Sequence, residues 1–311
     1  MYRRACKEDG DISPAAWMLG IIAVVFVFVA AVKPHEELPP QRTKVTSQEA
    51  LLEKAFPLIT AAPLPVRDAP PEVRIEVNIP ATEFTLYEND TALFRKPVAI
   101  GQGVYPTPEQ KSYIRMIEWN PWWIPPPGAD WVKDFRPRPP GPRNPMGLVK
   151  LPLSRAILFH GTPKAWSVGR PASHGCMRMH NGDVTMIAWY LQSNFSKQND
   201  PSLREVYRNN GGKTYKVSLD IPVPVKLVYR PVVARDDSLH FYPDYYGKLW
   251  GRRKEAIIAE LIRYGVDLSV LDDDKIEELA RQWPHQDEQV PIARLMRNPP
   301  PVDLLSAPES G

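Results

Sequence analysis

Apolar and polar residues alternate in the region where the chain first shows a regular pattern. The stretches "VRIEVNIP" (73–80), "TEFTLYEND" (82–90) and "TALFRKPVAIG" (91–101) each place apolar side chains at nearly every second position. That period is typical of a half-buried β-strand. The "ENDT" that joins the second stretch to the third carries turn-forming residues. We therefore predict successive short antiparallel strands here.

The strand pattern returns several times further along the chain, in "YIRMIEW" (113–119), "RAILFHG" (155–161), "TYKVSLDIPVPVKLVYRPVVA" (214–234) and "SLHFYPDYY" (238–246). One internal segment, "GDVTMIAWYLQ" (182–192), has helical spacing instead, with Asn181 or Asp183 available as an N-cap. The pattern predicts a mostly-β domain over residues 72–230. We expect an antiparallel β-sandwich with a short helix after Cys176.

Two stretches interrupt this pattern. "NPWWIPPPGADWVKDFRPRPPGPRNPMG" (120–147) is stiffened by its prolines and carries several tryptophans. It is either a loop packed on the domain by its own aromatic rings or a wall beside a cleft, and long ordered loops are often functional. The polar stretch "SNFSKQNDPSLREVYRNNGGK" (193–213) looks like an insertion.

Beyond Leu249 the spacing becomes helical in "RRKEAIIAELIRYG" (252–265) and "DDDKIEELARQW" (272–283). We expect residues 231–311 to form a C-terminal extension that is helical and then disordered. Its helices have two interpretations. Either they cap the domain and bury one apolar face, or they form a docking surface for another protein.

The N-terminal region contains an uncharged apolar run, "AAWMLGIIAVVFVFVAAV" (15–32). Its length reaches the lower limit for a membrane-spanning helix. The basic residues Arg3, Arg4 and Lys7 precede it, which favours a cytoplasmic segment over residues 1–14. The alternative is a signal peptide cleaved near Val29 and Ala31. Either way, the proline-rich linker (33–71) and everything after it are expected to be exported.

Composition adds two restrictions. The 39 basic residues face 36 acidic ones, for a formal net charge of +3, and no long basic run occurs, so a nucleic-acid partner is not indicated. The chain has two cysteines, Cys6 and Cys176, which the expected topology places on opposite sides of a membrane. An unpaired cysteine in an oxidising compartment must be shielded or used.

Cys176 lies in "SHGCMRMHN" (173–181), between His174 and His180, and a further histidine, His160, lies upstream. A structural zinc site normally uses at least two cysteines, and no HExxH motif is present. We therefore expect no metal and no cofactor.

A cysteine nucleophile accounts for more of these residues. It needs a base, and His160 ends the apolar strand "AILFH", which would hold the imidazole rigidly. Gly161 and Gly175 let backbone approach a substrate without a Cβ in the way. Cys176 is expected just before a helix, whose N-terminal dipole favours a thiolate. Arg178 adds positive charge that can hold a substrate carboxylate. His180 is interpreted as a hydrogen-bonded structural residue.

These residues resemble the signature of the L,D-transpeptidase (YkuD-type) catalytic domain family. In that family an HG pair is followed some sixteen residues later by S/T-H-G-C, a hydrophobic residue and Arg or Asn. This chain has "HGTPKAWSVGRPASHGCMRMHNGDV", with Cys176 sixteen residues after His160. The resemblance extends upstream through "NPWWIPPP" and "PPGPRNPMGLVKL" and downstream through "PVPVKLVYRPVVA". It covers about half of the chain, and the insertion at 193–213 and the C-terminal extension lie outside it.

The resemblance implies a role for each matched residue. Cys176 would be the nucleophile and His160 the proton acceptor and donor. Ser173 and His174 would organise the site around them, and the backbone at Gly175 would contribute to an oxyanion hole. The remaining candidates, assigned to substrate binding, are Gly161, Thr162 and Arg178.

The resemblance also implies a reaction, which is transfer of an acyl group from a peptidoglycan stem peptide to an amine, with release of D-Ala. Hydrolysis of the same acyl-enzyme, as an L,D-carboxypeptidase or endopeptidase, is the alternative within this chemistry. An inactive peptidoglycan-binding module is the alternative from another class. The expected location is the cell envelope, anchored in the cytoplasmic membrane by the N-terminal helix with the catalytic domain on the periplasmic side, or exported if the signal is cleaved. An envelope protein is the partner that the C-terminal helices would dock.

Overall fold

The computed structural model describes residues 70–132, 136–283 and 288–299. The expected cytoplasmic segment (1–14), the anchor or signal (15–32), all but the end of the linker (33–71), Cys6 and the C-terminal tail lie outside the described residues. None of the helices within these described ranges is long and apolar enough to cross a membrane.

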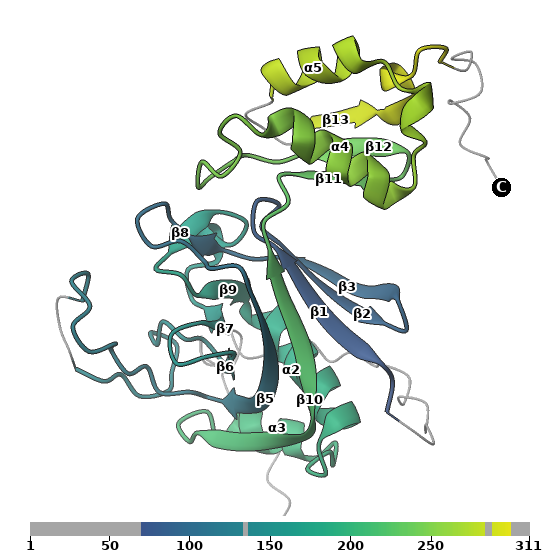
Figure 1. Ribbon diagram of the computed structural model, residues 1–311. Coiled ribbons are helices and arrows are strands. Elements are labelled where there is room, and N and C mark those ends of the chain that lie inside the picture. The colour runs from purple at the N-terminus through teal and green to yellow at the C-terminus, as the bar shows by residue number, and fades with distance from the viewer. Residues whose placement is uncertain (1–69, 133–135, 284–287, 300–311) are drawn as a thin grey trace, which may run out of the picture. The chain divides into compact units, whose positions relative to one another are not determined.

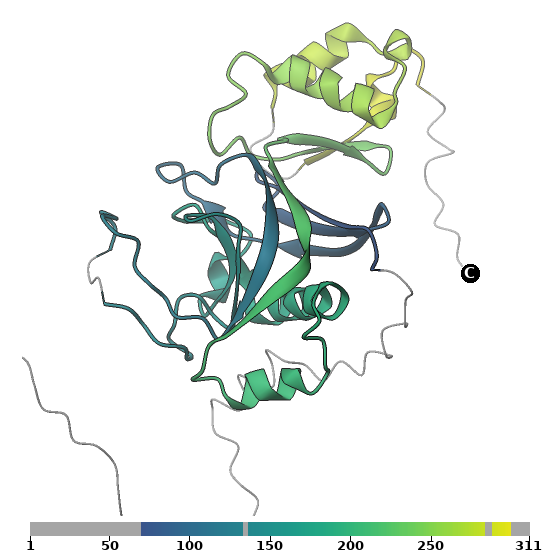
Figure 2. The same ribbon diagram turned by 60° about the horizontal axis from the view of Figure 1, so that its bottom comes forward.

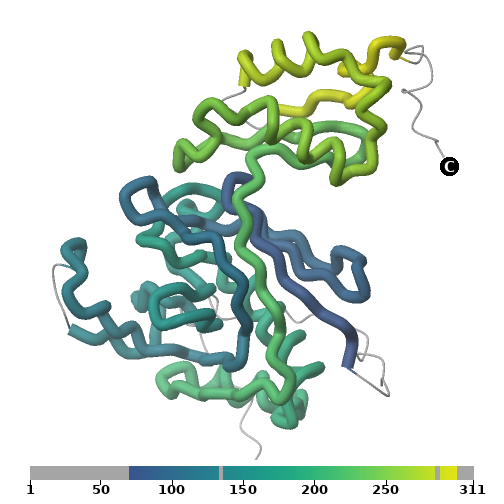
Figure 3. The backbone as a smooth tube through the Cα atoms, in the orientation of Figure 1, coloured from purple at the N-terminus to yellow at the C-terminus, as the bar shows by residue number. Residues whose placement is uncertain are grey.

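The described residues up to 228 are built around one large sheet, and the mostly-β prediction is confirmed. Eight strands of the described chain pair in the order β3-β2-β1-β10-β5-β6-β7-β9, with β1, β10 and β5 side by side at its centre (Figures 1 and 3). They are β1 (Val73–Asn78), β2 (Glu83–Glu88), β3 (Thr91–Pro97), β5 (Gln110–Trp119), β6 (Val149–Pro152), β7 (Leu158–Thr162), β9 (Met177–His180) and β10 (Tyr215–Val228). A separate short pair joins β4 (Ile100–Gly101) to β8 (Pro171–Ser173).

The expectation of a purely antiparallel sandwich is wrong in two respects. β1 pairs with β10, and β7 with β9, in parallel, and the strands hydrogen-bond as one sheet rather than two. Parallel neighbours need a crossover rather than a tight turn. The crossover between β7 and β9 contains the 3-10 helix η1 (Ala165–Ser167) and β8. The sheet nevertheless folds back on itself. β2 and β7 are not neighbours in the strand order, yet Phe84 of β2 meets Phe159 of β7 edge to face, with ring centroids 5.4 Å apart.

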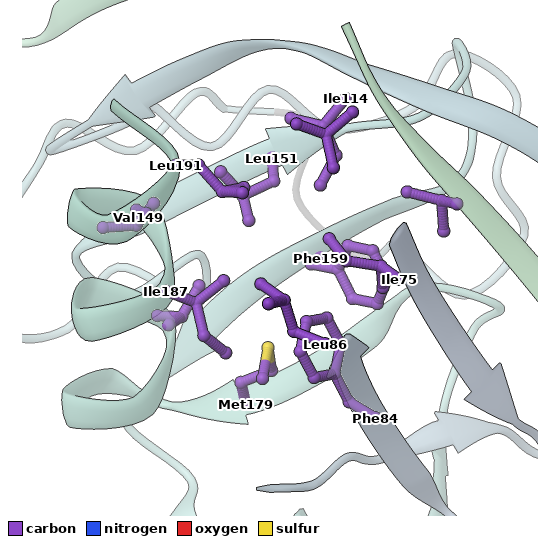
Figure 4. Packing of buried hydrophobic residues seen from close by; sticks show 14 of the residues in the cluster. Ile75, Phe84, Leu86, Ile114, Val149, Leu151, Phe159, Met179, Ile187 and Leu191 are labelled. Carbon is purple, nitrogen blue, oxygen red and sulfur yellow. The ribbon is translucent and has the colours of Figure 1, made fainter. Parts of the chain in front are cut away.

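Helix α2 (Asn181–Phe195) packs on the core side of this sheet. Ile187 and Leu191 point from the helix toward strand residues such as Leu151 and Met179 (Figure 4). All four of these side chains are fully buried. Burying a side chain of this size stabilises the fold by about 1.5–3 kcal/mol relative to leaving it exposed.

The helix predicted over 182–192 is α2, which begins at Asn181, but Met177–His180 between it and Cys176 form strand β9. Met177 and Met179 are fully buried while Arg178 and His180 are half-buried, which is the period-2 pattern of a strand. Asn181 is not a side-chain cap either. Its amide accepts from the Leu148 N–H (3.1 Å) and donates to the Thr162 carbonyl (3.3 Å), so it ties the helix start to β6 and β7.

The described part of the 120–147 loop contains no helix or regular strand, as expected. It is held by the isolated bridge between Trp123 and Arg138 and by Asn144, whose side chain donates to the Pro121 and Pro139 carbonyls (both 2.9 Å). The loop is therefore tied down by its own polar groups as well as by its aromatic rings.

The 193–213 insertion folds onto the end of β5. It contains helix α3 (Leu203–Asn209), which lies beside the adjoining ends of β5 and β10 in both views (Figures 1 and 2). The ring of Tyr207 stacks on Trp119 at 4.9 Å, and the Asn120 amide donates to the Tyr207 carbonyl (2.8 Å).

The C-terminal extension contains strands as well as helices. Its elements are β11 (Val232–Arg235), β12 (Ser238–Phe241), α4 (Arg253–Tyr264), η2 (Leu268–Val270), α5 (Asp273–Arg281), β13 (Glu288–Pro291) and η3 (Ile292–Leu295). The strands form an antiparallel sheet in the order β11-β12-β13. Ile257 and Leu261 of α4 are fully buried in a core shared with Leu239 and Phe241 of β12. The extension is therefore not helical throughout: the strand pattern at 238–246 forms β12, the helical patterns at 252–265 and 272–283 form α4 and α5, and the helices bury their apolar faces on the sheet.

Candidate active site

Strands β7 and β9 bring the histidine and the cysteine of the sequence motif together. Their parallel register pairs Phe159 with Met177 and His160 with Arg178. Paired residues share a face of the sheet, and Phe159 and Met177 are fully buried in the core. His160 and Arg178 therefore occupy the opposite face. Cys176 immediately precedes β9, next to Leu158 on β7.

The imidazole of His160 is almost completely buried. Its Nδ1 lies 2.6 Å from the carbonyl oxygen of Gly161. A carbonyl can only accept, so Nδ1 carries the proton in this arrangement and Nε2 keeps its lone pair. Burial lowers the pKa of His160 to about 4, although the carbonyls of Gly161 and Pro145 oppose this, and the positive charges of Arg178 and Lys150 lower it further. The imidazole of His160 is thus uncharged near neutral pH.

The thiol of Cys176 is half-buried, and its Sγ donates to the Ala156 carbonyl at 3.3 Å. Burial raises the pKa of Cys176 above its usual value. The Leu158 N–H and the positive charges of Arg178 and Lys150 act in the other direction without overcoming burial. The expected stabilisation of a thiolate by a helix N-terminus is wrong, since strand β9 separates Cys176 from α2. Burial thus favours the uncharged form of both the Cys176 thiol and the His160 imidazole.

A row of charged residues crosses the sheet toward this pair, and sequence reasoning missed it. The strand registers place Glu118 beside Lys150, Lys150 beside His160 and His160 beside Arg178. Lys150 and Glu118 form a largely buried ion pair with Nζ and Oε2 2.7 Å apart. The signal was available in "VKL", where a lysine stands between two fully buried residues, Val149 and Leu151.

The backbone before Cys176 is held by two hydroxyl groups. Ser173 Oγ accepts from the Gly175 N–H (3.1 Å) and donates to the Cys176 carbonyl (2.5 Å). Thr107 Oγ1 donates to the Gly175 carbonyl (2.9 Å). Gly175 has φ +101°, a conformation that favours glycine. Because its N–H is already engaged by Ser173, the Cys176 N–H is the better candidate for an oxyanion donor.

His174 has an aromatic rather than a polar environment. Its ring stacks on Trp131 (centroids 4.1 Å apart) and contacts Tyr105 (4.8 Å). Tyr105 donates to Asp130 at 2.7 Å. Burial, with the charge of Arg178, lowers the pKa of His174, so this ring too favours the neutral form. The contacts attach the 120–147 loop to the cysteine motif and support the interpretation of that loop as a wall of the site.

The remaining candidates are less accessible than expected. A Cβ on Gly161 would lie 2.1 Å from the Asn181 side chain, so glycine is needed there for close packing. Thr162 is buried, and its hydroxyl accepts from the Lys164 N–H (3.1 Å). His180 lies opposite Thr162 and precedes α2 without a side-chain cap bond. Across the described ranges, no three His, Cys, Asp or Glu side chains are grouped so that they could hold a metal ion.

Comparison with known proteins identifies the family of the domain. Residues 72–218 match the YkuD family of L,D-transpeptidase catalytic domains. The probable L,D-transpeptidase ErfK/SrfK of Escherichia coli K12 is 30% identical over 134 residues, which cover 38% of this chain and 41% of that protein. The putative L,D-transpeptidase YkuD of Bacillus subtilis 168 is 33% identical over 115 residues, which cover 37% of this chain and 57% of that protein. The chain thus spans about half the length of the curated relatives it matches.

Among solved structures, an L,D-transpeptidase of Mycobacterium tuberculosis H37Rv is similar at 17% identity and a TM-score of 0.32, covering 51% of this chain and 58% of that one. The sequence matches confirm the resemblance. Residues 72–218 are a catalytic domain of the YkuD family.

The raised pKa of Cys176 can be tested by titration. In a Cys6→Ser variant, Cys176 is the single cysteine of the chain. Its ultraviolet thiolate absorbance, measured against the additional Cys176→Ser variant, should have a midpoint above the usual value of about 9, because burial disfavours the charged form. Lys150→Met should raise the midpoint further, and Glu118→Gln combined with it should return the midpoint toward that of the parent. A midpoint well below 9 would instead mean a resting thiolate.

Proposed function

We propose that this chain is a peptidoglycan L,D-transpeptidase that works through a thioester on Cys176. The proposal is supported by one observation above all. In a domain of the YkuD family, β7 carries His160 and pairs in parallel with β9, and Cys176 immediately precedes β9. The matched relatives are named as probable or putative L,D-transpeptidases.

The first half of the reaction forms the thioester. The substrate is a tetrapeptide stem, cut between its third residue and its terminal D-Ala. A neutral thiol is a weak nucleophile, so its proton must leave as Sγ attacks the third residue's carbonyl carbon. Nε2 of His160 takes that proton, and the low pKa of the imidazole keeps this nitrogen available. The imidazolium then protonates the departing D-Ala amine, and the carbon–nitrogen bond breaks.

The negative oxygen of the tetrahedral intermediate needs a donor. We assign this role to the Cys176 backbone N–H. This N–H shares a peptide unit with the Gly175 carbonyl, which accepts a hydrogen bond from Thr107. One such donor contributes on the order of 3 kcal/mol in comparable enzymes. Arg178 adds positive potential beside the same face and can hold a substrate carboxylate. Ser173 and His174 position the backbone and the neighbouring loop.

The second half transfers the acyl group. The amine of a second stem attacks the thioester while Nε2 of His160 accepts its proton. The tetrahedral intermediate then collapses to an amide, and the thiol of Cys176 is restored with that proton. The thioester conserves much of the free energy of the broken amide, so this scheme uses no metal, nucleotide or other cofactor.

Acylation by a carbapenem tests the assignment of the reacting pair, since its strained ring presents a comparable carbonyl. Intact-mass measurement should show one adduct on the parent and none on Cys176→Ala. His160→Ala should be acylated roughly 10²–10⁴-fold more slowly, because the general base is lost. His240→Gln, which changes a histidine of the C-terminal extension, is the matched control. An adduct that persists without Cys176, or full reactivity without His160, contradicts the assignment.

The identity of the acceptor decides between transfer and hydrolysis. Muropeptides from cells with and without the protein should differ by new cross-links between two diamino acid residues, because transfer joins a third-position carbonyl to a side-chain amine. Tripeptide stems without such cross-links would establish a hydrolase. A pattern unchanged from that of cells producing Cys176→Ala would favour a binding module.

We place the catalytic domain outside the cytoplasmic membrane, on the strength of the apolar run at 15–32 and of a substrate that lies in the cell envelope. Alkaline phosphatase fused after residue 45 should be active in a bacterial host, because alkaline phosphatase folds only after export from the cytoplasm. A fusion after residue 12 should be inactive and serves as the control. An active fusion after residue 12 with an inactive fusion after residue 45 would mean that the catalytic domain lies in the cytoplasm.

A further inference from the structure

A tyrosine of the C-terminal extension is hydrogen-bonded to the wall of the active site. The Tyr246 hydroxyl donates to the Gly101 carbonyl (2.7 Å) and accepts from the Thr107 N–H (3.1 Å). The family match ends at residue 218, so Tyr246 lies outside it. One side chain therefore closes the two ends of the loop between Gly101 and Thr107.

The same loop holds the backbone at Cys176. Thr107 Oγ1 accepts from the Gly101 N–H (2.8 Å) and donates to the Gly175 carbonyl (2.9 Å). Thr107 is buried, so these bonds are shielded from competing water. The position of Thr107 Oγ1 depends on its own backbone, and that backbone is bonded to Tyr246.

Tyr246 is itself held in place. The Tyr246 backbone N–H donates to the hydroxyl of Tyr229 (2.9 Å), and that hydroxyl donates to Asp244 (2.6 Å). The two tyrosine rings stack with centroids 5.4 Å apart. Asp244 also accepts from the N–H groups of Lys248 and Leu249 (both 2.9 Å). Burial raises the pKa of Tyr246, so the phenol keeps the proton that it donates to Gly101.

The link to chemistry runs through one planar group. The carbonyl of Gly175 and the N–H of Cys176 belong to the same peptide unit, so fixing the direction of one fixes the direction of the other. We propose that Tyr246 is a positioning residue of the active site. Through Thr107 and the Gly175 carbonyl it orients the Cys176 N–H toward the developing oxyanion. This inference rests on the proposed function, because it assumes that an oxyanion forms at Cys176.

Tyr246→Phe removes the hydroxyl and keeps the ring that stacks on Tyr229. The second-order rate of carbapenem acylation should fall about tenfold, less than the hundredfold or more that complete loss of an oxyanion donor costs. Alkylation of Cys176 by iodoacetamide, measured in the Cys6→Ser background, should stay within about twofold, since that reaction forms no oxyanion. A role in general stability or access would move both rates together.

Two further variants separate positioning from packing. Thr107→Val should reproduce the loss, and combining it with Tyr246→Phe should add little, because both act through one network. Thr107→Ser, which keeps the hydroxyl, should restore most of the rate. Tyr264→Phe is the matched control, since it removes a tyrosine hydroxyl bonded only within the extension, to Asp237.

The inference is overturned if Tyr246→Phe is acylated at the parental rate, or if alkylation falls as far as acylation. Amide hydrogen exchange gives an independent result. Exchange at Thr107 and in the 173–177 segment should become faster in Tyr246→Phe and stay unchanged in Tyr264→Phe. If the parent forms no adduct, the proposed function fails. The exchange result then still decides whether Tyr246 holds this backbone, and exchange that is unchanged in Tyr246→Phe would show that it does not.

Discussion

Phe159, Met177 and Met179 all have to reach the core, and this requirement sets the direction of every other side chain on β7 and β9. The two strands run parallel with Phe159 beside Met177, so the intervening positions, His160 and Arg178, point away from the core. A shift of the register by one residue would place charged groups in the core and the methionines in the site. The burial of three apolar side chains therefore also aligns the imidazole with the cysteine.

Burial also decides the protonation of the site. It lowers the pKa of His160 and raises that of Cys176, so both groups rest uncharged. Lys150 and Arg178 flank His160 on the neighbouring strands and lower both pKa values. Their positive charge thus favours a thiolate and disfavours an imidazolium at the same time. This positive charge suits a mechanism in which His160 carries the thiol proton only briefly, between the cysteine and the leaving amine.

The sequence predicted the family and the mostly-β character of the domain better than the local structure around Cys176. Residue type and spacing single out His160 and Cys176 as the candidate base and nucleophile, and those two roles stay predictions. The helix predicted over 182–192 is present as α2, whereas strand β9 was not predicted, although "MRMH" alternates apolar and polar residues. Strand direction depends on pairings between residues far apart in the chain, as in β1 with β10, and no local period contains that information. The row from Glu118 to Arg178 was missed for the same reason, since its members come from four separate strands.

The extension beyond the family match contributes to the site because its Tyr246 hydroxyl hydrogen-bonds to backbone groups of Gly101 and Thr107. The loop from Gly101 to Thr107 passes so close to itself that a Cβ on Gly101 would lie 2.1 Å from the Tyr105 carbonyl. Buried backbone groups need hydrogen-bond partners, and at the two ends of this loop the Gly101 carbonyl and the Thr107 N–H both bond to a side chain. The Tyr246 hydroxyl can donate and accept at once, so it satisfies the Gly101 carbonyl and the Thr107 N–H together. Phenylalanine could fill the same space but could satisfy neither group. The hydroxyl therefore couples a segment beyond the family match, through Thr107, to the peptide unit between Gly175 and Cys176.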